Sequence, residues 1–150
     1  MKKVKVVLHV MADESGSYSP YKTNGSIHLE LEEKAGVKID FVSFCGMYLD
    51  GEVLERFLTE CEDAQVVIVD AWNHPLNKHY DSPGWLDPEE SIAKIAEQVI
   101  RINPLVKIFA DLMEGRHEVA VHKVAEPIRY WADNNVIEAV KRSIHKEGRS

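Results

Sequence analysis

Three aspartates follow apolar, strand-like runs at well-separated points of the chain. Asp13 lies just beyond KVKVVLHVM, Asp70 directly follows VVIV, and Asp111 directly follows LVKIFA. The carboxyl ends of parallel strands share one edge of a sheet, so these carboxylates are expected to become neighbours. Carboxylate oxygens bind Mg²⁺, and bound Mg²⁺ promotes phosphoester chemistry. The three aspartates are therefore candidate Mg²⁺ ligands, although aspartate also commonly caps the turn that follows a strand.

The stretch Ala64–Pro75, AQVVIVDAWNHP, places further reactive side chains at the same edge. Its β-branched run has no polar alternation, which is typical of a strand buried on both faces at the centre of a parallel sheet. His74 is the best candidate general base, and Asp70 is the other catalytic candidate. His9 and His28 fall inside predicted elements and are interpreted as packed or surface side chains. The full set of ligand-binding candidates is Asp13, Ser15, Asp70, Asn73, His74, Asp111 and Arg116.

Composition narrows the classes of function. The chain has 150 residues, a size typical of one domain, and a net charge of −7 that argues against nucleic-acid binding. It has no apolar run of the roughly 20 residues that a membrane span needs, and its first residues do not resemble a signal peptide. Cys45 and Cys61 are isolated and are interpreted as buried thiols in a reducing compartment. We therefore expect a cytoplasmic protein without membrane insertion.

Strand-like and helix-like segments alternate along the chain. This pattern predicts a single α/β domain over residues 1–150, with a three-layer, mostly parallel five-stranded sheet and helices on both faces, flavodoxin-like or Rossmann-like. Strands are expected at Lys3–Met11, Val37–Phe44, Val66–Val69, Leu105–Ala110 and Glu118–Val124. Helices are expected at Ser26–Ala35, after Asp50, after Asp87, and from Glu126 to about Lys146.

Part of the chain resembles the RCK/TrkA-N domains, the cytoplasmic gating modules of potassium channels and transporters. Val42–Arg56, VSFCGMYLDGEVLER, is similar to a strand, turn and helix of that family, and Arg101–Ala110, RINPLVKIFA, is similar to a later segment. The resemblance covers about half of the chain. It implies a regulatory domain that binds a nucleotide or another small ligand and forms a homodimer. Met47 and Leu49 depart from the family pattern, and no GxGxxG motif follows a strand.

A second resemblance, to response-regulator receiver domains, covers more of the chain with weaker motifs. It implies that Asp13 and Glu14 form an acidic pair after the first strand and that Asp70 is a phosphoacceptor. Asp111 stands near the position where that family has a hydroxyl, and Glu126-Pro127 stands where it has Lys-Pro.

Three hypotheses about function stay open. The first is a regulatory domain that binds a small molecule, expected to be a nucleotide, at the carboxyl ends of the strands. The second is a Mg²⁺-dependent enzyme acting on a phosphorylated or nucleotide substrate through Asp13, Asp70 and Asp111. The third is a receiver-like signalling domain, with or without phosphorylation.

Overall fold

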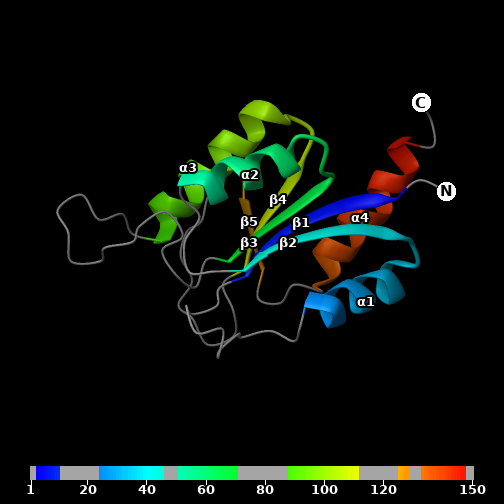
Figure 1. The fold of residues 1–150 in the computed structure, drawn as a ribbon. Helices are drawn as coiled ribbons and strands as arrows, with labels where there is room; N and C mark the ends of the chain where they lie inside the picture. Colours follow the sequence, from blue (N-terminus) through cyan, green and yellow to red (C-terminus); the bar gives the residue numbers. More distant parts are fainter. Residues whose placement is uncertain are drawn as a thin grey trace.

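The computed structural model describes residues 3–10, 24–45, 51–70, 88–111, 125–128 and 133–147. Within these residues, strands and helices follow one another along the chain (Figure 1). The strands are β1 (Val4–Val10), β2 (Ile39–Cys45), β3 (Val66–Asp70), β4 (Lys107–Asp111) and β5 (Ala125–Ile128). The helices are α1 (Asn24–Ala35), α2 (Gly51–Cys61), α3 (Pro88–Ile102) and α4 (Asn134–Glu147).

The sheet has five strands in the order β2-β1-β3-β4-β5, and every neighbouring pair is parallel. This confirms the predicted α/β fold class. The strand that the sequence places at the centre, β3, is the middle strand, and its residues Val66–Val69 are at most 1% exposed. A run without polar residues is needed here because helices cover both faces of the sheet.

Helices cover the two faces in pairs. Phe57 of α2 and Ile95 of α3 pack on one face of the sheet, whereas Leu31 of α1 and Val136 of α4 pack on the other (Figure 1). We call these the α2/α3 face and the α1/α4 face.

Local hydrogen bonds define the end of α1 and the start of α4. Gly36 ends α1 with a left-handed φ of 70°, and its N–H donates to the carbonyl of Glu32 at 2.9 Å, as in a helix-terminating αL motif. Asp133 caps α4, because its Oδ1 accepts from the N–H of Asn135 at 2.8 Å. Among the described residues, no helix is both long and apolar enough to cross a membrane.

The predicted start of the last helix, at Glu126, was wrong. The sequence favours a strand at 118–124 and a helix from Glu126, but Glu126 and Pro127 lie inside β5, and 118–124 lies outside the described residues. Pro127 misled the prediction because proline, which has no N–H, commonly opens a helix. An edge strand tolerates proline because one of its sides needs no hydrogen bonds, and β5 is at the edge of the sheet.

Candidate functional site

Two of the predicted site residues meet at the carboxyl edge of the sheet. Asp70 is the last residue of β3, Asp111 is the last residue of β4, and the two are register partners. Neighbouring strands lie about 4.8 Å apart, so the two aspartate backbones are adjacent although 40 positions separate them in the chain. The expectation that aspartates distant in sequence become neighbours is confirmed for this pair at the level of the backbone.

The five strands end almost level with one another. Val10 is the register partner of Cys45, Asp70 pairs with Asp111, and Asp111 pairs with Ile128. His9 of β1 is the register partner of Val69 of β3. Each strand ends at the next residue, Val10 and Asp70, so these two strands also end at the same height. We call this edge the carboxyl rim. A level rim lets groups from several strands act on one ligand.

Three of the connections that leave the carboxyl rim are much longer than those at the opposite edge. Residues 11–23 follow β1, 71–87 follow β3 and 112–124 follow β4, whereas the turns that lead into β2, β3 and β4 span only 36–38, 62–65 and 103–106. In α/β proteins the connections beyond the strand ends supply most ligand-binding groups. The greater part of the chain available for a site therefore follows the carboxyl rim.

The strand order also identifies the position along the carboxyl rim where a ligand is expected to bind. The chain moves outward from β1 to β2, then returns to the other side of β1 and continues through β3, β4 and β5. The helices that follow β1 and β3, α1 and α3, cover opposite faces of the sheet, and ligands of open α/β sheets bind in the crevice at such a reversal of strand order. Asp70 ends one of these two strands.

The remaining predicted site residues are not tested. Asp13, Ser15, Asn73, His74 and Arg116 lie outside the described residues, as do the side chains of Asp70, Asp111 and Cys45. Within the part of the chain that the structure describes, no group of three or more histidine, cysteine, aspartate or glutamate side chains is placed to hold a metal ion.

A buried histidine was not among the predicted site residues. His9 of β1 is 1% exposed, and it lies one residue before the carboxyl rim, between the register partners Phe44 and Val69. The sequence signal was present, because His9 is the one polar residue in the run VVLHV. The interpretation of His9 as a packed side chain is confirmed, but its position beside the crevice could not be read from the sequence.

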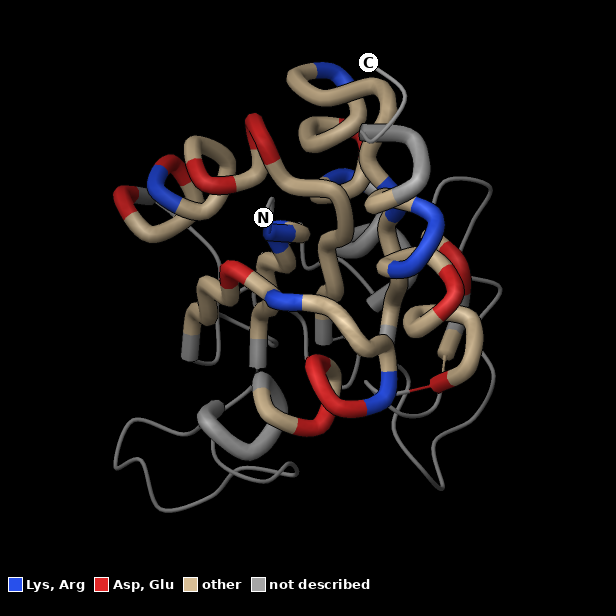
Figure 2. The backbone as a smooth tube through the Cα atoms, turned by 90° about the vertical axis from the view of Figure 1, so that its right-hand side faces the viewer, with Lys and Arg blue, Asp and Glu red and all other residues tan. Residues whose placement is uncertain are grey.

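A groove of about 850 Å³ lies at the opposite, amino edge of the sheet. The turns at 62–65 and 103–106 form one wall and α4 forms the other, and Figure 2 looks onto this edge. Much of its polar lining already has partners. Lys107 Nζ lies 3.0 Å from Glu126 Oε1, and Asn103 Nδ2 donates to the carbonyls of Cys61 and Ala64 at 2.9 and 2.8 Å. Asn103 thus holds the two turns together, and the Lys107–Glu126 ion pair joins β4 to β5.

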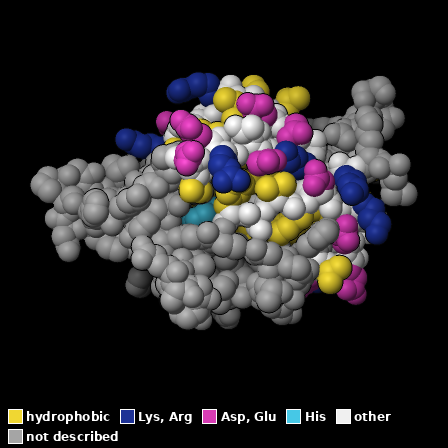
Figure 3. Space-filling view, viewed as in Figure 1, with side chains coloured by type: hydrophobic (Ala, Val, Ile, Leu, Met, Phe, Trp, Pro, Cys, Tyr) yellow, Lys and Arg dark blue, Asp and Glu magenta, His cyan; other side chains and the backbone are white. Residues whose placement is uncertain are grey.

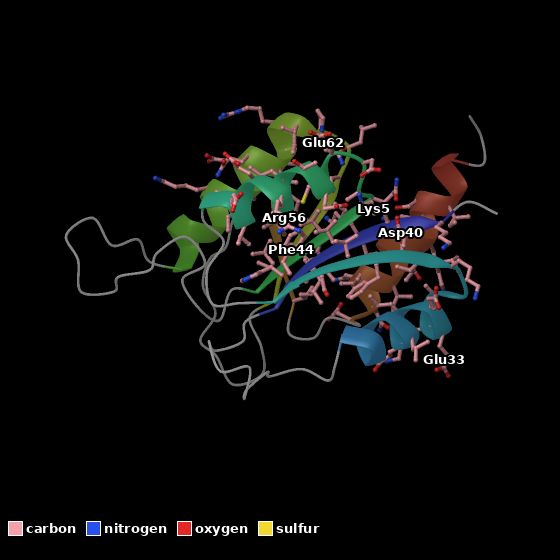
Figure 4. The ribbon with its side chains drawn as sticks, viewed as in Figure 1. Lys5, Glu33, Asp40, Phe44, Arg56 and Glu62 are labelled. Carbon is pink, nitrogen blue, oxygen red and sulfur yellow. The ribbon has the colours of Figure 1, made fainter. Side chains whose placement is uncertain are left out.

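Lys5 extends this network to β1 (Figure 4). Its Nζ lies 2.6 Å from Asp63 Oδ1 and 2.9 Å from Glu60 Oε1, and its N–H donates to Gln65 Oε1 at 2.6 Å. Burial disfavours the charged form, but the hydrogen bonds and attraction from Asp63 and Glu60 outweigh it and raise the pKa of Lys5 above 10.5. Lys5 therefore fixes the α2–β3 turn as a structural ion-pair centre.

The outer surface of α2 and α3 carries both signs of charge. Acidic and basic side chains are interspersed over these helices in the face seen in Figure 3. The described side chains on this face therefore form no concentrated basic patch.

Comparison of the chain with protein families, with curated proteins and with solved structures found no match in any of the three.

Proposed function

We propose that the protein binds a small phosphorylated ligand, a nucleotide in the first instance, at the carboxyl rim beside the crevice between β1 and β3. The observation that carries this proposal is the register pairing of Asp70 with Asp111 on a level rim, next to the point where the strand order reverses. Ligand binding at that point follows from the strand directions and needs no particular sequence motif.

The aspartate pair supports a metal-assisted mode of binding. Two carboxylates on adjacent strands repel each other, and a divalent cation between them removes the repulsion. Mg²⁺ is usually bound in proteins by one or two carboxylates together with the phosphates of a substrate. Asp70 and Asp111 would hold Mg²⁺, and the ion would bind the phosphate oxygens of the ligand.

The same pair favours a second candidate function, a Mg²⁺-dependent enzyme acting on a phosphorylated or nucleotide substrate. There the ion would stabilise negative charge that develops on the phosphoryl group. The resemblance of Val42–Arg56 to RCK domains supports the regulatory alternative, a homodimeric cytoplasmic module without turnover. The receiver-like alternative assigns Asp70 as a phosphoacceptor.

Calorimetric titration with ATP, ADP and NAD, each with and without Mg²⁺, tests the proposal. We expect binding that requires Mg²⁺ and that is weakened at least about tenfold in Asp70→Asn and in Asp111→Asn, because each loses one ligand charge. Asp40→Asn is the matched control, since Asp40 is an exposed aspartate near the start of β2, away from the rim. Equal affinity in all four proteins would refute the rim assignment.

The same proteins separate the alternatives. Turnover of the bound nucleotide that disappears in Asp70→Asn indicates the enzyme, and binding without turnover indicates the regulatory domain. Labelling of wild type but not Asp70→Asn by acetyl phosphate indicates the receiver-like domain.

A further inference from the structure

The groove at the amino edge of the sheet lies beside α4, along a margin of the sheet that α4 does not reach. Among the strands, α4 contacts β1 and β3 most closely, whereas the groove extends over the first residues of β4 and β5, Lys107 and Glu126. Lys107 is on the α1/α4 face, because Phe109, two residues further along β4, belongs to the apolar cluster of that face. The groove of about 850 Å³ is far larger than the gaps that close packing leaves inside a domain, so another molecule has room to enter it.

The α4 wall of the groove is a single stripe of the helix. Its members recur at the three- and four-residue spacing that places side chains on one side of a helix: Asn135, Glu138, Ala139, Arg142 and Ser143. Two of them, Ala139 and Ser143, are small, and Ser143 Oγ already donates to the carbonyl of Ala139 at 2.9 Å. A second helix can therefore approach this stripe closely, to the interaxial distance of about 8–10 Å that packed helices have.

The charges on this stripe are complementary to a second copy of themselves. Glu138 and Arg142 are exposed and lie one helical turn apart, yet neither forms an ion pair within the residues that the structure describes. If a second α4 runs antiparallel beside the first, with a two-fold axis next to Val140, each Glu138 lies opposite Arg142 of the other copy. The same contact then forms twice, as in the isologous interfaces of symmetric dimers.

The opposite wall of the groove supplies an apolar contact for the same helix. Leu105, in the turn at 103–106, is 91% exposed, more than any other large apolar side chain of the described residues. A helix placed between this turn and α4 would remove Leu105 from water, which is favourable. Val106 and Ala64 line the groove as well and are buried, so the surface near Leu105 is also partly apolar.

We propose that the groove is a homodimer interface, in which α4 of a second copy lies antiparallel to α4 and forms two reciprocal ion pairs between Glu138 and Arg142. Leu105 of each copy covers the α4 of the other. The interface lies at the amino edge, opposite the carboxyl rim, so both rims stay accessible in the dimer. This inference does not depend on ligand binding at the rim.

Sedimentation velocity of the whole chain tests the interface. An interface built around one helix is small, so we expect wild-type dimers that dissociate on dilution within about 1–100 µM. Glu138→Arg and Arg142→Glu should each raise the dissociation constant at least about tenfold, because each places like charges opposite one another. Lys141→Glu is the matched control: it makes the same change of charge as Arg142→Glu on an exposed residue of α4 that does not line the groove. Melting temperatures show that all the variants are folded.

A mixture of the two single variants tests the reciprocal pairing itself. In a mixed dimer of Glu138→Arg with Arg142→Glu, one α4 is positive at both positions and the other is negative at both, so both contacts again join opposite charges. We expect dimers to reappear when the two variants are mixed. Mixing Glu138→Arg with Lys141→Glu gives the same total charge but leaves one pair of like charges, and should restore fewer dimers.

Leu105→Ser tests the apolar wall, with Leu29→Ser as its control, since Leu29 is 65% exposed on α1 and does not line the groove. We expect only Leu105→Ser to weaken the dimer. A monomeric wild type over the whole concentration range would overturn the inference. Dimers that all three groove variants leave intact, or single variants that do not recover on mixing, would also overturn it.

Discussion

Asp70 and Asp111 end adjacent parallel strands at the same height and are register partners. β3 and β4 are paired residue by residue from Val66 and Lys107 to these two aspartates, so the two strands start and stop together. The short turns at 62–65 and 103–106, held by Lys5 and Asn103, set that start for β3 and β4. The amino edge thus fixes the geometry of the carboxyl rim, which makes its contacts the natural targets for tests of stability.

Lys5→Met should destabilise the protein by about 1 kcal/mol at neutral pH, because two ion pairs with partly exposed acids are lost. The pKa of Lys5 is higher in the folded protein than the ordinary 10.5. Its charge therefore contributes stability below pH 10.5, and that contribution disappears as the pH rises through the raised value. Urea unfolding at pH 7 and above pH 11 measures both effects.

Lys3→Met is the control for this prediction, since Lys3 is exposed. Its stability should stay within about 0.5 kcal/mol of wild type at each pH. A difference between wild type and Lys5→Met that stays constant up to high pH would contradict the ion-pair account.

Asn103→Ala should cost about 1–3 kcal/mol, because the carbonyls of Cys61 and Ala64 lose a shared donor where they are partly or fully buried. Urea denaturation measures this loss. Asn135→Ala removes the same side chain from an exposed position of α4 and should change stability by less than about 0.5 kcal/mol. Equal effects of the two substitutions would show that the contacts of Asn103 do not hold the turns.

Cys61 should resist alkylation while the protein is folded. Its side chain is fully buried, and burial raises the pKa of its thiol to about 12, so the reactive thiolate is scarce at pH 8. Treatment with iodoacetamide, followed by mass spectrometry of the peptide that contains Cys61, should show modification only in denaturant. Rapid labelling of Cys61 in the native protein would contradict this environment.

Much of the fold was predictable because hydrophobic periodicity reports burial directly. The alternation within Val37–Phe44 predicts that Ile39 and Phe41 share one face of the strand and that Val42 and Phe44 share the other, and the two apolar clusters confirm it. The helical periodicity after Asp50 predicts that Val53 of α2 is buried, and this prediction was wrong, since Val53 is 43% exposed. Val53 lies at the border of the apolar stripe of α2. The sequence of a helix shows where its apolar stripe lies, but not how far the neighbouring elements extend over the border of that stripe.

The candidate site was predictable only in part. Asp70 and Asp111 could be proposed as neighbours because parallel strands must end at a common edge. The place of Pro127 within β5 could not be predicted. Proline is tolerated in an edge strand, and the order of strands in the sheet decides which strand lies at the edge. The place of His9 beside the crevice depends on that same order, which a linear pattern does not contain.

The most direct test of the account is a titration of the ¹⁵N-labelled protein with ATP–Mg²⁺, followed by amide chemical shifts. The account predicts that the largest shifts occur at the strand ends Val10, Cys45, Asp70 and Asp111. Shifts concentrated instead at Gln65, Asn103 and Lys107, in the groove at the amino edge, would contradict it.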